Sequence, residues 1–502
     1  MRLIASRPTA RSAGGTAPVR RGLPGSRSPR PAQPPSARAR FVLALAAGKA
    51  ASKASRVLRF GGGTSFPGAV ARRIDPDVLQ KVAAASGASK VVVTGSNGKT
   101  TTCRMLAALA QAGGLKVAQN RSGSNLVQGV ISAAVRGTDL RGRMDASLLL
   151  LEVDEATVPA VTPELAPDAL VITNIFRDQL DRFGELYTVA TGLAAVIDSL
   201  PGSATVVLNA DDPLVASLAP GALARRVHYG IRAGGAGTQV PEHAADTIRC
   251  VRCQRQLSYR AVYLSHLGDY ECPGCGNARP LLDVAVTAIQ PSPGAGAEIK
   301  IETPAGTFPL TVPLAGIHNI YNAAASIAAA VALSLPRPRE IGQAEHALAG
   351  LRPAFGRMEP IQAGNRQVVL SFVKNPTAYN ATLREVLQQP GRKHVLAAHS
   401  NTDVDGEDFA WLWDVDLEQL VPQLASLVVS GTRAEEVALR FKYAGADQAI
   451  MRMLPGRAAA LDAALNQTPA GEPLYILAGY TPMRELRGIM QRRGWVPPSW
   501  KE

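Results

Sequence analysis

One short segment restricts the fold of this chain more than any other, because residues 91–102 read VVVTGSNGKTTT. A short apolar strand that turns through glycines into a helix is typical of α/β proteins that bind phosphate groups. Gly95 and Gly98 leave room for backbone amides to surround a phosphate. Lys99 can reach the terminal phosphates, and the Thr100 hydroxyl is a ligand for Mg²⁺. The segment predicts a nucleoside triphosphate site; the alternative is a glycine turn without a chemical role.

The chain alternates short apolar runs with helical stretches, the pattern of a parallel sheet covered by helices. A long alanine-rich helix is expected over residues 319–335, before Pro336. A second alternation begins near Gly356 and predicts a smaller α/β domain of the Rossmann type. The expected strands are residues 91–94, 147–153, 169–173, 205–208, 284–289 and 298–301 in the first set, and 368–372, 394–398, 426–430 and 474–478 in the second.

These patterns divide the chain into a tail over residues 1–40, a central ATP-binding domain over 41–355 and a C-terminal α/β domain over 356–502. The tail is rich in Arg, Pro and Ser without hydrophobic periodicity, so it is predicted to be disordered. An upstream start codon and an organelle transit peptide both explain such a leader. Apolar spacing predicts an amphipathic helix over 41–60, and GGGTSFPG predicts a loop over 61–68.

Positive charge is concentrated at the N-terminus, since residues 1–74 hold 15 of the 54 basic residues and no acidic one. The remainder carries 39 basic and 40 acidic residues and is close to neutral. Because nucleic-acid binding needs clustered positive charge on the folded surface, no nucleic-acid partner is expected. No apolar run reaches the ~18 residues of a membrane span, and residues 41–47 are too short for a convincing signal peptide. We expect a cytoplasmic protein that is not an integral membrane protein.

Four of the five cysteines form two close pairs, Cys250 with Cys253 and Cys272 with Cys275. The 18 residues between the pairs fit the spacing of a four-cysteine zinc site. We therefore predict an inserted zinc ribbon at about residues 246–281, against the alternative that two thiol pairs occur by chance. Four thiolates leave no open coordination position, so the expected role of Zn²⁺ is structural.

Acidic residues end two of the expected strands. The run LLLLEVDE over residues 148–155 ends in Glu152, Asp154 and Glu155. The next expected strand ends in the segment ITNIFRDQLD over residues 172–181, which contains Asp178 and Asp181. Because the carboxyl ends of parallel strands face the ligand crevice, Glu152 is expected to hold Mg²⁺. Asp154 and Glu155 are explained equally well as solvated turn residues.

In this order, the motifs resemble the Mur ligase family, ATP-dependent enzymes that join an amine to a carboxylate in peptidoglycan synthesis. The resemblance runs from about Gly61 to the C-terminus and includes TGSNGKTTT, TNIFRDQLD, NADDP at 209–213, HNIYN at 318–322 and GRME at 356–359. It implies a Mur-ligase-like fold, with adenine against Asn319 and Asn322 and the phosphates near Arg357. The implied Mg-ATP site further includes Gly95, Asn97, Gly98, Lys99, Thr100, Thr101 and Glu152.

Two departures point to one branch of this family, the MurT subunits of lipid II isoglutaminyl synthase. Amino-acid-adding Mur ligases carry DHLD where this chain has DQLD at 178–181, and the paired cysteines are an insertion. Three C-terminal segments are also similar to that branch: KNPT at 374–377, NTDVDGED at 401–408 and WLWDVD at 411–416.

The branch implies ATP-dependent amidation of the D-glutamate α-carboxylate in the lipid II stem to D-isoglutamine, through an acyl phosphate. The chain shows no evident Cys–His glutaminase pair, and the resemblance implies that ammonia comes from a separate glutamine amidotransferase subunit, GatD. The C-terminal domain is expected to contact that partner and lend an aspartate that orients its histidine. Asp405 is the first choice and Asp408 the second; the alternative for either is a solvated turn carboxylate.

Two other interpretations stay open. An amino-acid-adding Mur ligase or a folylpolyglutamate synthase would share the ATP site and fold, although Gln179 and the cysteine insertion count against both. From another class, a zinc-ribbon nucleic-acid-binding protein with a nucleotide site would use the basic N-terminus, although the near-neutral remainder of the chain counts against it.

Overall fold

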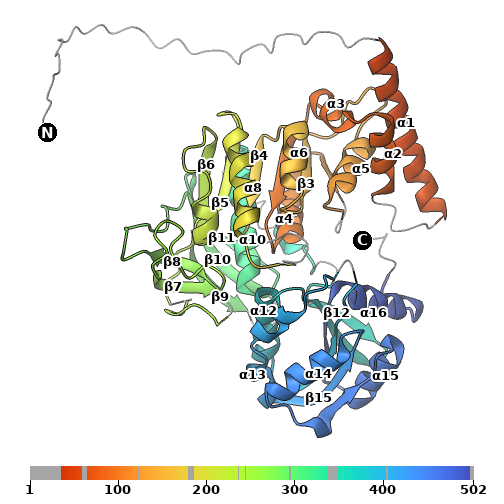
Figure 1. Cartoon of the computed structure of the whole chain (residues 1–502), viewed down its shortest axis with the longest axis vertical. Helices are drawn as coiled ribbons and strands as arrows, with labels where there is room; N and C mark the ends of the chain where they lie inside the picture. The colour runs from red at the N-terminus through yellow and green to blue at the C-terminus, as the bar shows by residue number, and fades with distance from the viewer. Residues whose placement is uncertain are drawn as a thin grey trace, which may run out of the picture.

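The structure is a computed structural model that describes residues 35–58, 65–120, 124–178, 186–235, 237–243, 245–292, 296–335, 347–353, 356–402 and 405–497. Two sheets, each covered by helices, follow one another along the chain (Figure 1). Within the described ranges, every helix is too short or too polar to cross a membrane.

The larger sheet has nine strands in the order β11-β10-β9-β6-β5-β4-β1-β3-β2. Neighbours are parallel from β2 to β9, and β10 and β11 complete the sheet as antiparallel strands. The strands are β1 Ser89–Thr94, β2 Val117–Gln119, β3 Leu148–Glu152, β4 Ala169–Ile172, β5 Thr205–Asn209, β6 Arg225–Ile231, β9 Val284–Ser292, β10 Gly296–Thr303 and β11 Gly306–Val312.

Helices bury both faces of this sheet. The central strands are apolar on both sides, as in strand β1, where Val91 and Val93 face one core and Val92 faces the other. The first core includes α4 Lys99–Ala112 and α10 Ile317–Ala332. The second includes α1 Pro35–Leu58, α2 Phe66–Ile74, α3 Val78–Ala85, α5 Val127–Gly137, α6 Val158–Leu165, α8 Leu186–Ser199 and the short α9 Pro213–Ala216.

An insertion between β6 and β9 forms a small lobe beside the larger sheet (Figure 1). It contains the antiparallel hairpin of β7 Ser258–Leu264 and β8 Leu267–Glu271. The two cysteine pairs flank this hairpin, and Cys250, Cys272, Leu257 and Tyr270 form its small core.

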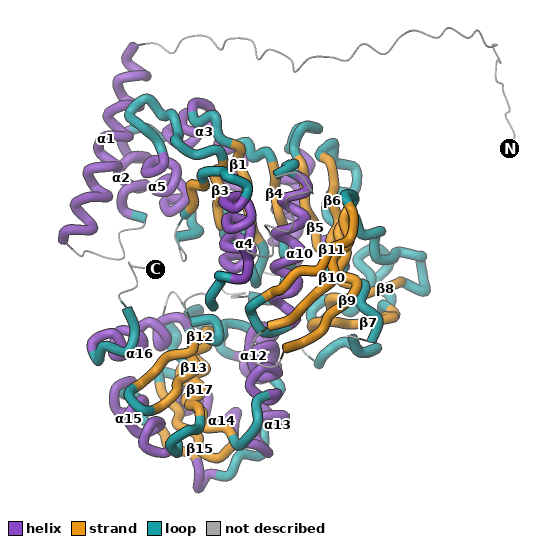
Figure 2. Tube along the Cα trace, turned by 180° about the vertical axis from the view of Figure 1, so that it is seen from behind, coloured by secondary structure: helices purple, strands orange, loops and turns teal. Residues whose placement is uncertain are grey.

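The second sheet has six strands in the order β12-β13-β17-β14-β15-β16, all parallel except β12. Figure 2 shows this part of the chain, with helices beside the strands. Its strands are β12 Glu359–Ala363, β13 Arg366–Phe372, β14 Lys393–Ala398, β15 Leu424–Ser430, β16 Met451–Met453 and β17 Pro473–Ala478. The helices that cover it are α12 Pro376–Gln388, α13 Leu417–Leu420, α14 Ala434–Tyr443, α15 Arg457–Gln467 and α16 Tyr480–Arg492.

All ten strands expected from the sequence are present, with ends shifted by at most three residues. The apolar pattern does not indicate β2, β6, β7, β8, β11, β12 or β16, which are short, lie at sheet edges or carry polar residues between apolar ones. The expected α/β class with parallel sheets is therefore confirmed. The predicted boundary between the central and the C-terminal domain, after residue 355, adjoins residues 354–355, which lie outside the described residues. This boundary stays a prediction.

Three sequence-based boundaries are wrong. Helix α1 starts at Pro35, so the disordered tail predicted for residues 1–40 is contradicted at 35–40, and residues 1–34 lie outside the described chain. Helix α2 starts at Phe66 inside the predicted 61–68 loop, because proline is tolerated in a first helical turn. Helix α10 spans Ile317–Ala332 rather than 319–335, since Ser334 has a left-handed φ of 51°.

Candidate active site

The glycine loop, residues 95–98, joins β1 to α4 and requires glycine at two positions. Gly95 and Gly98 have φ angles of 123° and 88°. A Cβ atom on Gly98 would lie 2.1 Å from Asn322 Oδ1, and one on Gly95 would lie 2.3 Å from Thr173 Oγ1. Helix α4 has no side-chain cap at Gly98, so the N–H groups of its first turn are left for an anion.

The end of β4 supports the glycine loop. The Asn97 N–H donates to Asn174 Oδ1 at 2.9 Å, and Asn174 Nδ2 donates back to the Asn97 carbonyl at 3.1 Å. Thr173 Oγ1 donates to the same carbonyl at 2.7 Å. Thr173 and Asn174 directly follow β4, which pairs with β1 in the sheet. The end of β4 therefore lies beside the glycine loop that follows β1 and holds it, although the two are distant in sequence.

Lys99 and Glu155 form a buried ion pair beside the glycine loop. Their Nζ and Oε2 atoms are 2.9 Å apart, and the residues are only 7% and 5% exposed. Burial lowers the pKa of Lys99, but Glu155 and Asp154 outweigh burial and raise it. Burial likewise raises the pKa of Glu155, but Lys99 and Lys374 outweigh it and lower it. The interpretation of Glu155 as a solvated turn residue is therefore wrong.

Thr100 and Glu152 face each other at the start of α4 and the end of β3. Thr100 Oγ1 donates to Glu152 Oε2 at 2.9 Å, and Glu152 is 6% exposed. Burial raises the pKa of Glu152, although Lys99 and Thr100 counteract it. A buried carboxylate next to a hydroxyl is the oxygen set that Mg²⁺ prefers, and a cation would offset the burial of the charge. These residues fit Mg²⁺.

Helix α10 places the two asparagines implied for adenine beside the glycine loop. Asn322 Nδ2 donates to Asn319 Oδ1 at 3.1 Å, and Thr102 Oγ1 donates to Asn322 Oδ1 at 3.3 Å. Thr101, the next member of the implied site, is buried in α4. Burial raises the pKa of Glu152, and Arg357 is near enough to that carboxyl to oppose the rise. The roles in nucleotide binding stay predictions.

Residues from the second sheet reach this site. Lys374, which follows β13, forms an ion pair with Asp178, which follows β4. Asn375 Nδ2 is 3.4 Å from Asn97 Oδ1, so the next residue touches the glycine loop itself. Lys374 and Asp178 belong to the motifs KNPT and TNIFRDQLD, but no role is predicted for either from the sequence. The signal that could have found them is their position after an expected strand. Gln179 and Asp181 lie outside the described residues.

The four paired cysteines come together in the inserted lobe, with all Sγ atoms within 4.8 Å of one another. The Sγ atoms of Cys250 and Cys275 are 3.6 Å apart, and those of Cys253 and Cys272 are 3.4 Å apart. Four sulfurs around zinc at ~2.3 Å would be about 3.8 Å from each other. The cluster therefore fits a tetrahedral zinc ion.

Zinc should be bound by these cysteines and stabilise the lobe. Protein purified without chelator is expected to contain one zinc per chain by elemental analysis, and Cys272→Ser should lose most of it. Cys103→Ser is the matched control, because Cys103 is buried in α4 and outside the cluster. Zinc-free wild-type protein, or unchanged zinc in Cys272→Ser, would contradict the assignment.

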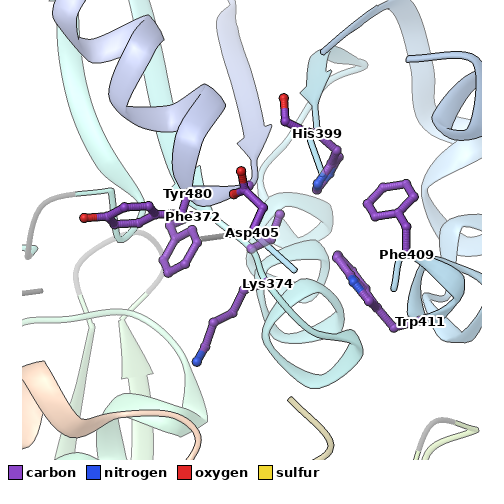
Figure 3. Close-up of a pocket in the computed structure, with 10 residues that line it drawn as sticks. Phe372, Lys374, His399, Asp405, Phe409, Trp411 and Tyr480 are labelled. Carbon is purple, nitrogen blue, oxygen red and sulfur yellow. The ribbon is translucent and has the colours of Figure 1, made fainter. Parts of the chain in front are cut away.

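The two candidate aspartates differ in setting. Asp405 is half-buried; its Oδ1 accepts the Thr481 N–H at 3.0 Å, and its Oδ2 accepts the Thr402 hydroxyl at 2.7 Å. Asp408 is exposed and accepts the Ala410 N–H at 2.9 Å. Asp405 is therefore the carboxylate held in a fixed orientation, and it lines a small cavity (Figure 3).

Comparison with known families agrees with this arrangement of fold and site. Residues 93–250 match the model of the Mur ligase middle domain, and residues 372–483 match that of the MurT ligase C-terminal region. Together with the fold and the glycine loop at the carboxyl end of β1, these matches define a Mur-type ligase, an ATP-dependent class of enzyme.

Two similar proteins indicate which branch of the Mur ligases the chain belongs to. The chain is 32% identical to the MurT subunit of the glutamine-hydrolysing lipid II isoglutaminyl synthase of Staphylococcus aureus, over 79% of this chain and 86% of that protein. It is 30% identical to the corresponding MurT subunit of Streptococcus pneumoniae, over 87% and 94%. The chain therefore belongs to the MurT family of Mur ligases.

A solved structure shares the fold at low sequence identity. Folylpolyglutamate synthase of Mycobacterium tuberculosis, complexed with ADP and AMPPCP, aligns over 91% of this chain and 96% of its own with a TM-score of 0.58. At 16% identity, this likeness concerns the fold alone.

Proposed function

We propose that this chain is the synthase subunit of a lipid II isoglutaminyl synthase in peptidoglycan synthesis. It would use ATP to activate the α-carboxylate of D-glutamate in the lipid II stem, and ammonia would convert that group to D-isoglutamine. The observation that carries the proposal is the meeting of Lys374, from the segment that matches the MurT model, with Asp178 beside the glycine loop. The reaction would occur in the cytoplasm, at the membrane face that carries lipid II.

The first step would be phosphoryl transfer from ATP to the carboxylate, which turns a poor leaving group into a good one. Amides at the start of α4 and the Lys99 ammonium would hold the phosphates, and Arg357 would add positive charge. Thr100 and Glu152 would hold Mg²⁺, which neutralises phosphate charge when bound. Catalysis would then rest on positioning and charge stabilisation rather than on a covalent enzyme intermediate.

The second step would be attack of ammonia on the acyl phosphate, with loss of phosphate. Cys103 offers no glutaminase nucleophile, because burial and nearby Glu152 raise its pKa well above the usual range. The remaining cysteines form the cluster in the inserted lobe. We therefore propose a separate glutaminase subunit of the GatD type that contacts residues 356–502, with Asp405 orienting its histidine.

The direct test is reconstitution. The chain and a co-purified glutaminase subunit are incubated with lipid II, ATP and glutamine, and the stem peptide is analysed by mass spectrometry. We expect amidation of D-glutamate that requires ATP and either glutamine or added ammonium. Addition of an amino acid to the stem instead would favour the amino-acid-adding ligases, and an unchanged stem under all conditions would contradict the proposal.

A further inference from the structure

The inserted lobe packs against the segment that follows β4 and, through it, against the glycine loop. His266, in the turn between β7 and β8, is fully buried, and its ring centroid lies 4.9 Å from that of Phe176. The Phe176 N–H donates to Ser96 Oγ at 2.9 Å, and Ser96 Oγ donates to the Phe176 carbonyl at 3.1 Å. The lobe is therefore fixed to the loop that is predicted to hold the phosphates.

The same lobe also binds a helix of the domain built on the second sheet. Glu242 accepts two hydrogen bonds from Arg384 of α12, with Nη1 2.5 Å from Oε1 and Nη2 3.2 Å from Oε2. The Ser265 N–H donates to the same Oε1 at 2.6 Å, so the hairpin turn holds this carboxylate in place. Glu242 thus connects the lobe directly to α12.

Arg177 joins the lobe to the same domain at a second point. Its backbone N–H donates to Asp246 Oδ2 at 2.9 Å, and its guanidinium pairs with Asp246 and, at 3.1 Å, with Asp414. Burial lowers the pKa of Arg177, but Asp246 and Asp414 outweigh burial and raise it. Asp414 belongs to the segment WLWDVD, so the insertion and this segment, two sequence features similar to the MurT branch, meet in the structure.

These contacts hold α12 at two points. At its start, Asn375 touches Asn97 of the glycine loop, and the preceding Lys374 pairs with Asp178. Arg384 lies nine residues after Asn375, which corresponds to about 13 Å along a helix. A helix held only at its start can tilt, whereas one held at both points has a fixed direction. Because α12 also contributes to the core of its domain, its direction sets that of the domain.

We propose that the inserted lobe is a strut that positions the domain of the second sheet over the nucleotide site, with Glu242 as the positioning residue that aligns Lys374. The proposal rests on the proposed function. The Glu242 and Arg384 side chains are 18% and 35% exposed, and ion pairs that water reaches contribute little to the free energy of unfolding. A displacement of 1 Å at a reacting centre, by contrast, can slow a reaction by about 10²-fold. Loss of the pair should therefore affect the rate more than the stability.

Charge reversal tests this pair. The chain with its glutaminase subunit is supplied with lipid II, ATP and added ammonium salt, so that amidation does not depend on glutamine hydrolysis. Glu242→Arg should lower kcat by about tenfold or more, with the KM for ATP within about twofold of wild type because the glycine loop is unchanged. The double variant Glu242→Arg/Arg384→Glu restores opposite charges and should return kcat to within about threefold of wild type.

Glu302→Arg is the matched control, because Glu302 pairs with Arg232 beside the larger sheet and has no part in the strut. It should keep wild-type kcat. Thermal unfolding of Glu242→Arg should stay within about 4 °C of wild type. If Glu242→Arg does not fold, Arg384→Gln tests the pair from the other side without a like charge, and kcat should still fall by about threefold or more.

Hydrogen exchange reports the position of α12 without any turnover. Backbone amides of residues 375–388 should exchange faster in Glu242→Arg, and at the wild-type rate in the double variant and in Glu302→Arg. The amides of α16, in the same domain, should exchange equally in all four proteins. This readout separates failure of the strut from failure of the proposed function, which would appear as a wild-type complex that never amidates the stem.

Three results would overturn the strut. Equal kcat in Glu242→Arg and Glu302→Arg, with unchanged exchange of α12, would mean that the pair is incidental. A loss of kcat that the double variant does not recover would mean that Glu242 acts only by holding the hairpin turn. A raised KM for ATP with unchanged kcat would assign the lobe to nucleotide binding instead.

Discussion

Lys99→Ala is expected to lower ATP-dependent amidation by about 10²-fold to 10³-fold or more, the range seen when a single charge-stabilising donor is lost. Lys99 is the cation at the N-terminus of α4, and the proposed chemistry concentrates negative charge there during phosphoryl transfer. The measurement is the rate of phosphate release and of stem amidation at saturating ATP. Near-normal turnover of the variant would contradict the role of Lys99.

The same substitution should also affect folding, because Glu155 would lose its buried partner. Breaking a buried ion pair by removing one member costs about 3 to 5 kcal/mol, and both side chains are less than 10% exposed. The double variant Lys99→Ala/Glu155→Gln removes the unpaired charge and should recover much of the free energy of unfolding. It should not recover activity, and this difference separates a catalytic role of Lys99 from a structural one.

Asp405→Asn is expected to lower glutamine-dependent amidation by about 10³-fold or more, as loss of a histidine-orienting carboxylate does in catalytic triads. An amide carries no charge to stabilise an imidazolium and presents a different hydrogen-bonding edge. Amidation driven by added ammonium salt should persist, because Lys99, Thr100 and Glu152 are unchanged. The two rates are measured on the same preparation, at a pH where some free ammonia exists.

Asp408→Asn is the matched control, since Asp408 lies three residues away and is exposed. We expect it to leave both rates close to wild type. The reverse pattern, with glutamine-dependent loss only in Asp408→Asn, would move the role to Asp408. Equal loss of both rates in Asp405→Asn would instead assign Asp405 to the ligase site or to folding.

Local sequence determined the elements that carry the proposed chemistry. The apolar runs before Gly95 and around Leu150 predict strands without tertiary information, because central parallel strands are buried on both faces. The glycines, Lys99 and Thr100 predict a phosphate site at that loop from adjacent residues alone. The C-x-x-C pairs predict a metal cluster by spacing, and the four Sγ atoms do come together.

The partners of these residues were settled by tertiary structure. In the sequence, Glu155 is indistinguishable from a solvated acidic residue in a turn. In the structure, the segment after β3 lies against the start of α4 and buries Glu155 beside Lys99, where an unpaired charge would be costly. Lys374 is 196 residues from Asp178, so no local pattern could pair them. Their ion pair forms because the segments that follow β4 and β13, which belong to two different sheets, meet. The small cavity that Asp405 lines likewise lies between segments that follow β13, β14 and β17, which are distant in sequence. Local sequence specifies backbone turns and periodic burial, whereas charge pairing and cavities depend on which distant strands lie side by side.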